Sequence, residues 1–100
     1  MNKSQNITKL IGYSRSGILS KDLVRAETSN ATLFCMSKGT EMSEHTSTKQ
    51  GYVYVLEGKG VFTLKGEKIA RAPGVLIFMK KNAGHSIKAD ENTSFLLFLY

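Results

Sequence analysis

The stretch GTEMSEHTSTKQGYVYVLEG, residues 39–58, decides the fold. From Tyr52 to Val55 it alternates tyrosine with valine, which is the two-residue period of a β-strand. Gly58 ends the stretch, and a glycine directly after such a run is typical of a tight turn. We expect the valines to face the protein interior and the tyrosines to lie on the outer face of a sheet.

Similar short runs occur along the rest of the chain. They are rich in β-branched, aromatic and large aliphatic residues, and no window after residue 30 keeps the spacing of an amphipathic helix. The sequence therefore predicts an all-β domain with at least six strands. The runs are residues 31–37, 52–56, 61–64, 75–79 and 95–100, with weaker candidates at 18–24, 68–71 and 85–89. Glycines lie between runs, where hairpins need a positive φ or a tight turn, at Gly58, Gly60, Gly66 and Gly74.

Two of the runs, residues 75–79 and 95–100, are apolar at successive positions, so both of their faces need to be covered. A barrel interior covers one face, and the N-terminal segment or a second copy of the chain covers the other. We therefore expect a homodimer. We divide the chain into an N-terminal segment, residues 1–30, with an edge or exchanged strand, and a barrel, residues 31–100. Residues 1–5 are expected to fray.

The basic residues are scattered along the chain. The formal net charge is +6, but Lys80 and Lys81 form the only adjacent basic pair, and no aromatic residues alternate with them. This spacing favours solubility over recognition of nucleic acid, so we expect no nucleic-acid partner. The content of 41% hydrophobic and 22% charged residues is that of an ordinary globular protein.

The cysteine content and the hydropathy pattern bear on location. Cys35 is the single cysteine, so an internal disulfide is excluded and nothing indicates an oxidising compartment. The longest fully apolar run, residues 95–100, is too short to span a bilayer, and the first nine residues are polar. We expect a cytoplasmic protein with no membrane partner.

Two stretches resemble the sequence motifs of the cupin superfamily. The first motif has the pattern Gly, five residues, His-x-His, three residues, Glu, six residues, Gly. Residues 39–58 fit this spacing, with His45 at the first histidine and Gly58 at the last glycine. Ser47 stands at the second histidine and Gly51 at the glutamate, so two of the family's metal ligands are absent.

The second motif has the pattern Gly, five residues, Pro-x-Gly, two residues, His, three residues, Asn. The stretch GVLIFMKKNAGHSIKA, residues 74–89, keeps Gly74 and His85 in this spacing. Lys80 stands at the proline and Asn82 at the inner glycine, and the final asparagine is also replaced. Two motifs in the right order, with both remaining histidines in register, identify the fold more firmly than either motif alone.

The resemblance implies a double-stranded β-helix, that is, a jelly-roll or cupin barrel in a single domain. Members of the superfamily are commonly dimers that exchange N-terminal strands. They include isomerases, dioxygenases, cyclases, storage proteins and ligand-sensing domains, so the fold does not determine the function. The segments EHTS (residues 44–47) and VYVLEG (residues 53–58) resemble those of a subgroup of small one-domain cupins that also lack the second histidine and the glutamate.

The resemblance also implies a metal in the barrel mouth, but the ligand set is incomplete. A catalytic divalent metal usually has three protein ligands and an open position. Here His45 and His85 alone are in register. Glu41 has the same parity as His45 but precedes the expected strand, whereas Glu44 faces the opposite side of it. Neither carboxylate is expected to complete the set.

We expect the barrel mouth to bind a small organic molecule. The residues expected at this site are His45, Ser47, Gln50, Val53 and His85. No residue is assigned a catalytic role, because nothing orients His45 to activate the hydroxyl of Ser47. The alternative is a metal-dependent isomerase, dioxygenase or cyclase in which His45 and His85 hold a divalent ion (Zn, Fe, Mn or Ni). A third class is a structural or regulatory domain that acts through a protein partner.

Overall fold

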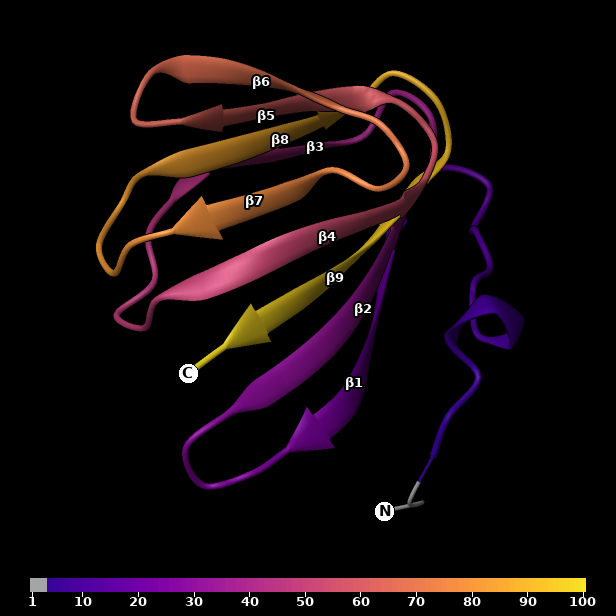
Figure 1. Cartoon of the computed structure of the whole chain (residues 1–100). Coiled ribbons are helices and arrows are strands. Elements are labelled where there is room, and N and C mark those ends of the chain that lie inside the picture. The colour runs from indigo at the N-terminus through magenta and orange to yellow at the C-terminus, as the bar shows by residue number, and fades with distance from the viewer. Residues whose placement is uncertain (1–3) are drawn as a thin grey trace.

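The computed structural model describes residues 4–100, and this part of the chain forms nine β-strands and one short 3₁₀ helix (Figure 1). The all-β prediction is confirmed. The predicted fraying concerned residues 1–5, most of which lie outside the described residues. The elements are η1 (Ile7–Lys9), β1 (Ile18–Arg25), β2 (Asn30–Met36), β3 (Glu41–His45), β4 (Gly51–Glu57), β5 (Gly60–Leu64), β6 (Glu67–Arg71), β7 (Leu76–Met79), β8 (His85–Ala89) and β9 (Thr93–Leu99).

The strands form two antiparallel sheets that face each other (Figure 1). Sheet A has the order β1-β2-β9-β4-β7, and sheet B has the order β3-β8-β5-β6. Neighbouring strands are often distant in sequence, as in the pairing of β2 with β9. The chain therefore passes repeatedly from one sheet to the other, as in a jelly roll.

The main core lies between the two sheets, and strand alternation builds it. Along β4, Val53 and Val55 are buried while Tyr54 is exposed on the outside, which confirms the predicted orientation of this strand. The same alternation turns every second residue of β7, β8 and β9 inward. The buried residues of this core are Met36, Val53, Phe62, Ile77, Met79, Ile87, Ala89 and Phe95.

A second cluster lies on the outer face of sheet A. Leu33 and Cys35 of β2 face outward and are nonetheless buried. Side chains of the N-terminal segment pack against them, including Leu10 and Ile11. β1 pairs with β2 and forms one edge of sheet A. The N-terminal segment thus covers part of the outer face, as one of the two expected arrangements requires, whereas exchange of β1 between two copies stays a prediction.

At two turns, the residue present is one that adopts a positive φ readily. Gly58 has a φ of 89°, and a Cβ there would lie 2.6 Å from the Cα of Thr93, so no larger residue fits without a shift. Asn82, which replaces the inner glycine of the second motif, has a φ of 65°. Asparagine tolerates this left-handed conformation better than most residues, so the turn survives the substitution.

One sequence expectation needs correction here. Gly60 was expected in a turn, but it is the first residue of β5 and its φ is not positive. A Cβ at Gly60 would overlap the carbonyl oxygen of Lys88 and lie 2.8 Å from Nη2 of Arg71, so the glycine makes room for the backbone of β8 as well as for this side chain. Arg71 itself is 1% exposed. One basic residue is therefore buried in the barrel.

Candidate functional site

A β-bulge in β3 brings the two histidines together. Met42 of β3 pairs with Ile87 of β8, and His45 pairs with His85. Two residues separate the first pair from the second along β3, but only one residue separates them along β8. This extra residue is a β-bulge, and it turns both Met42 and His45 toward the barrel interior.

The bulge also corrects the predicted position of Glu41. We expected Glu41 to share the parity of His45 and to precede the strand. Instead, Glu41 is the first residue of β3, and it lies opposite Lys88 on the outer face of sheet B. Strand β3 ends at His45, so Ser47 lies in the following loop and not on the strand. A period-two argument fails here because it assumes an unbroken strand.

The imidazole rings of His45 and His85 meet edge to face, with their centroids 4.1 Å apart. Nδ1 of His45 lies 2.8 Å from the carbonyl oxygen of Ser43, and Nδ1 of His85 lies 3.0 Å from that of Ala83. A carbonyl oxygen only accepts, so each Nδ1 carries the hydrogen and donates it. In the neutral rings each Nε2 then has a free lone pair, which no hydrogen bond in the described part of the chain uses.

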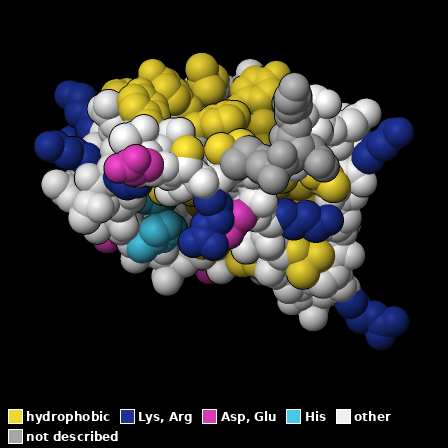
Figure 2. Space-filling view, turned by 90° about the horizontal axis from the view of Figure 1, so that it is seen from below, with side chains coloured by type: hydrophobic (Ala, Val, Ile, Leu, Met, Phe, Trp, Pro, Cys, Tyr) yellow, Lys and Arg dark blue, Asp and Glu magenta, His cyan; other side chains and the backbone are white. Residues whose placement is uncertain are grey.

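The two histidines differ in their contact with solvent. His45 is exposed, and a histidine is visible at the surface in Figure 2, whereas His85 is 6% exposed. The ring of His85 also stacks on Phe62, with centroids 5.7 Å apart. Burial lowers the pKa of His85, and the neighbouring His45 lowers it further, against the opposing effects of the Ala83 hydrogen bond and of Glu44. His85 is therefore neutral at physiological pH.

A small apolar cavity lies directly inside this histidine pair. Its volume is about 50 Å³, and it is enclosed by residues of both sheets. A water molecule takes about 30 Å³ in the liquid, so the cavity holds only a few heavy atoms as it stands. Its polar lining consists of the two imidazoles. The lining residues are Phe34, Met42, His45, Val53, Phe62, Met79, His85, Ile87, Phe95 and Leu97.

Of the residues predicted from sequence, the structure brings His45, Val53 and His85 around this cavity. Ser47 lies in the loop after β3, where its hydroxyl accepts a hydrogen bond from the backbone N–H of Lys49. Gln50 faces a separate surface hollow between the loop before β4 and the loop after β7. Ser47 and Gln50 therefore do not line the cavity.

The donor set does not fit a tightly held metal ion. Within residues 4–100 no group of three or more His, Cys, Asp or Glu side chains converges. Gly51 stands where the family has its glutamate, and a Cβ there would overlap the carbonyl oxygen of Phe98 and approach Cδ2 of Leu99 to 2.7 Å. The backbone of β9 thus occupies the space that a metal-binding carboxylate would need. Two imidazoles remain where a catalytic metal usually has three protein ligands.

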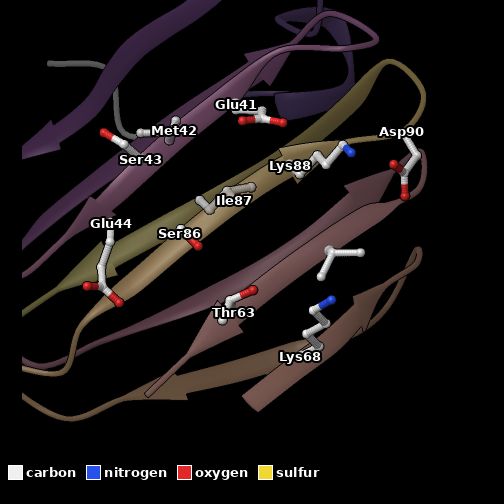
Figure 3. A pocket seen from close by; sticks show the side chains of 11 residues that line it. Glu41, Met42, Ser43, Glu44, Thr63, Lys68, Ser86, Ile87, Lys88 and Asp90 are labelled. Carbon is white, nitrogen blue, oxygen red and sulfur yellow. The ribbon is translucent and has the colours of Figure 1, made fainter. Parts of the chain in front are cut away.

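A different hollow, of about 470 Å³, opens on the outer face of sheet B (Figure 3). Glu41, Glu44 and Asp90 line it together with Lys68 and Lys88, so its charges largely compensate one another. The histidine pair is not part of it. We therefore place the candidate site in the barrel mouth and not on this face.

Sequence reasoning missed several residues of the interior. Met42 escaped notice because the bulge hides its orientation. Arg71 escaped notice because its strand was a weak candidate, yet the signal was present: Ile69 and Arg71 share parity, so an inward Ile69 implies an inward Arg71.

Comparisons with known proteins agree with this architecture. Residues 32–99 match the Cupin domain family. A conserved protein of unknown function from Streptococcus pyogenes is 27% identical, with a TM-score of 0.88 over 99% of this chain and 87% of that chain. A cupin superfamily protein from Desulfitobacterium hafniense is 20% identical, with a TM-score of 0.89 over 99% of this chain and 91% of that one.

Salicylate 1,2-dioxygenase from Pseudoaminobacter salicylatoxidans is a more distant neighbour. It is 18% identical, with a TM-score of 0.78 over 83% of this chain and 26% of that chain, and at this identity the likeness concerns the fold alone. A search of curated proteins found no match. No helix within residues 4–100 has the length and apolar character needed to cross a membrane.

Proposed function

Because the chain belongs to the cupin family, whose shared fold carries many activities, we propose its function from the barrel mouth: it binds a small organic molecule there through His45 and His85. The observation that carries this proposal is the pair of imidazoles over a small apolar cavity. A few polar groups above an apolar pocket are the usual composition of a small-molecule site.

The chemistry of the site indicates which ligands it accepts. Because each Nδ1 donates to a carbonyl, the neutral form of either imidazole keeps a lone pair on Nε2 that accepts a hydrogen bond, so the ligand should present hydroxyl or N–H donors. Its apolar part would enter the cavity, and Met42 and Met79 can rearrange to admit it because methionine is flexible. Ser47 and Gln50 would contact only a part of the ligand that protrudes from the mouth.

A thermal-shift screen tests this function. We expect small hydroxylated or N–H-bearing compounds to raise the melting temperature of the wild type, and we expect the His45→Ala, His85→Ala double variant to lose the response. Lys68→Ala is the control, because it alters the hollow on sheet B and leaves the mouth intact. A response that survives in the double variant but not in Lys68→Ala would move the site to sheet B and contradict the proposal.

The second candidate is a metal-dependent enzyme of the isomerase, dioxygenase or cyclase type, in which His45 and His85 hold a divalent ion. It is favoured by one observation, the free lone pair on both Nε2 atoms, since metal-binding histidines often donate their other N–H to a backbone carbonyl. Elemental analysis of protein purified without a histidine tag decides between the two. Stoichiometric metal that is lost in the His45→Ala, His85→Ala variant would favour the enzyme over the binding module.

The proposal includes a homodimer. Leu76, Phe78, Tyr54, Phe98 and Tyr100 are between 38% and 61% exposed on the outer face of sheet A, next to the part that the N-terminal segment covers. Hydrophobic side chains also gather along one side of the surface in Figure 2. Exposed apolar and aromatic side chains that lie together are typical of interfaces, and a second copy of the chain would cover them.

Sedimentation at micromolar concentration tests the dimer. We expect a dimer for the wild type and a monomer for Leu76→Glu, which places a charge on the most exposed of these residues. Lys68→Ala changes a residue on the outer face of sheet B and should remain dimeric. A monomeric wild type would contradict the proposal.

A cytoplasmic location is also proposed, supported by the lone cysteine, which is buried and unpaired.

A further inference from the structure

Arg71 is a buried cation whose nitrogens lack partners. Its side chain is 1% exposed, and Nε, Nη1 and Nη2 make no hydrogen bond to any of the described residues. Guanidinium groups carry five N–H donors in a planar fork, and buried donors in folded proteins are normally satisfied. The functions considered above do not involve this side chain.

The charge on Arg71 is also poorly compensated. Burial lowers its pKa to about 10, with Asp90 acting in the opposite direction, so the group remains protonated at neutral pH. Asp90 lies exposed after β8 and forms no ion pair with Arg71. The guanidinium carbon lies 4.9 Å from the ring centroid of Phe95, and this cation–π contact is only a partial substitute for a counter-charge. In the described part of the chain no water-sized space adjoins the three nitrogens, so an acceptor reaches them only when neighbouring side chains move, and water in that place would not neutralise the charge.

Arg71 does not itself line the cavity at the mouth, but it shares a neighbour with it. Gly60 lies opposite Arg71 in the register of β5 and β6, and a side chain at Gly60 would collide with the guanidinium. Phe95 contacts the guanidinium on one side and also lines the 50 Å³ cavity beside His45 and His85. One aromatic ring is therefore common to the cation and to the candidate ligand site.

We propose that Arg71 anchors a carboxylate inside the barrel. The planar fork of a guanidinium matches a carboxylate in two parallel hydrogen bonds, which supplies both the missing acceptors and the missing charge. The carboxylate is either a free short acid, such as formate, or the acidic end of the molecule that binds at the mouth. The second source rests on the proposed ligand-binding function, and it narrows the ligand to a small carboxylic acid that also carries a hydrogen-bond donor.

Thermal unfolding with carboxylate salts at constant ionic strength tests the proposal. We expect sodium formate and acetate to raise the melting temperature of the wild type relative to sodium chloride, by on the order of 10 °C when the acid exceeds its Kd about a hundredfold. Arg71→Met should lose this specific rise. An equal rise in Arg71→Met would assign the effect to surface lysines and overturn the proposal, as would the absence of any carboxylate-specific rise in the wild type.

The carbon-chain length of the added acid distinguishes the two sources of carboxylate. If the acid is free, formate stabilises the wild type and the His45→Ala, His85→Ala variant equally, and longer hydroxylated acids give no additional effect. If it is the acidic end of the barrel ligand, hydroxylated acids of some greater length give a larger rise that requires both Arg71 and the histidines. If formate stabilises the wild type but longer acids give no additional rise, the result would count against the ligand-binding function and leave the Arg71 site intact.

A crystal structure of the wild type grown with formate gives a readout that does not depend on how the variants fold. We expect density for formate against the guanidinium of Arg71. Density for water alone, or for the carboxylate of Asp90 turned inward to pair with Arg71, would overturn the proposal.

Discussion

The two ends of the barrel interior accommodate polar side chains in different ways. At the mouth, His45 and His85 each donate the Nδ1 hydrogen to a backbone carbonyl two residues earlier in the chain, and burial favours the neutral form of His85. At the other end, where β6 finishes, Arg71 is charged and has only the face of Phe95 as a partner among the described residues. A polar group in a low-dielectric interior is inexpensive when a local partner satisfies it and costly when none does.

This difference indicates what each end is suited to. The histidines are already held in place, so a ligand gains contacts there without having to rescue an unstable group. Arg71 is destabilising on its own, so whatever binds it also stabilises the fold. The comparison predicts that mutations at the two ends act on different quantities: on affinity at the mouth and on folding stability at the Arg71 end.

Phe95→Ala should have the largest effect, because this ring belongs to both ends. Phe95 is 1% exposed, and truncation of a buried phenylalanine costs about 3–5 kcal/mol in the free energy of unfolding. Urea denaturation measures the loss. The control is Leu76→Ala, whose side chain is 61% exposed and which should change stability by less than about 1 kcal/mol under conditions where the protein is monomeric. Similar losses for both variants would show that the interior is not packed around Phe95.

Arg71→Met should raise the free energy of unfolding in buffer without carboxylates. Replacement of a poorly compensated buried charge by an apolar side chain of similar length is neutral or stabilising, by about 1–4 kcal/mol. The matched variant at the mouth, His85→Met, should not be stabilising in this way, because the carbonyl of Ala83 would lose its donor. The midpoints of urea denaturation measure the stabilities of both variants, provided that the free energy of unfolding depends on urea concentration with the same slope. Destabilisation by Arg71→Met would mean that the guanidinium already has a partner.

The sequence predicted one end of the barrel much better than the other. The mouth follows from spacing along the chain, because the positions of His45 and His85 relative to nearby glycines are local information. The strand pattern likewise predicted the inward valines of β4. The bulge in β3 was not predictable from alternation, so Glu41 received the wrong parity. The burial of Arg71 depends on which strands pack across the barrel, and that pairing is not visible in one short run of residues.

Acidification should destabilise the mouth through His85, by a smaller amount. Its pKa in the folded state lies below the value of about 6.5 in the unfolded chain, so folding favours the neutral ring. The stability that comes from keeping His85 neutral is fully present above the unfolded-state pKa, and it is lost as the pH falls through the folded-state pKa. Between about pH 7 and pH 5, where carboxylates stay ionised, urea midpoints should fall for the wild type. The fall should be smaller in His85→Asn, whose amide can still donate to Ala83.

His45→Asn is the matched control for the pH effect. The charge of His45 is one of the causes that lower the pKa of His85, so its removal should reduce the fall in stability without abolishing it. A fall that is unchanged in His85→Asn would assign the pH dependence to groups outside the mouth.

The smallest expected effects are those of Ser47→Ala and Gln50→Ala on ligand affinity. Neither residue lines the cavity, so each substitution should change the Kd of a mouth ligand by less than about twofold, a difference below roughly 0.4 kcal/mol. His45→Ala should weaken the same ligand by tenfold or so, since a hydrogen bond contributes about 1 kcal/mol or more. Calorimetric titration of the three variants provides the comparison. If Ser47→Ala or Gln50→Ala weakened binding as much as His45→Ala, the ligand would lie across the rim and not inside the barrel, and the interior at Arg71 would be out of its reach.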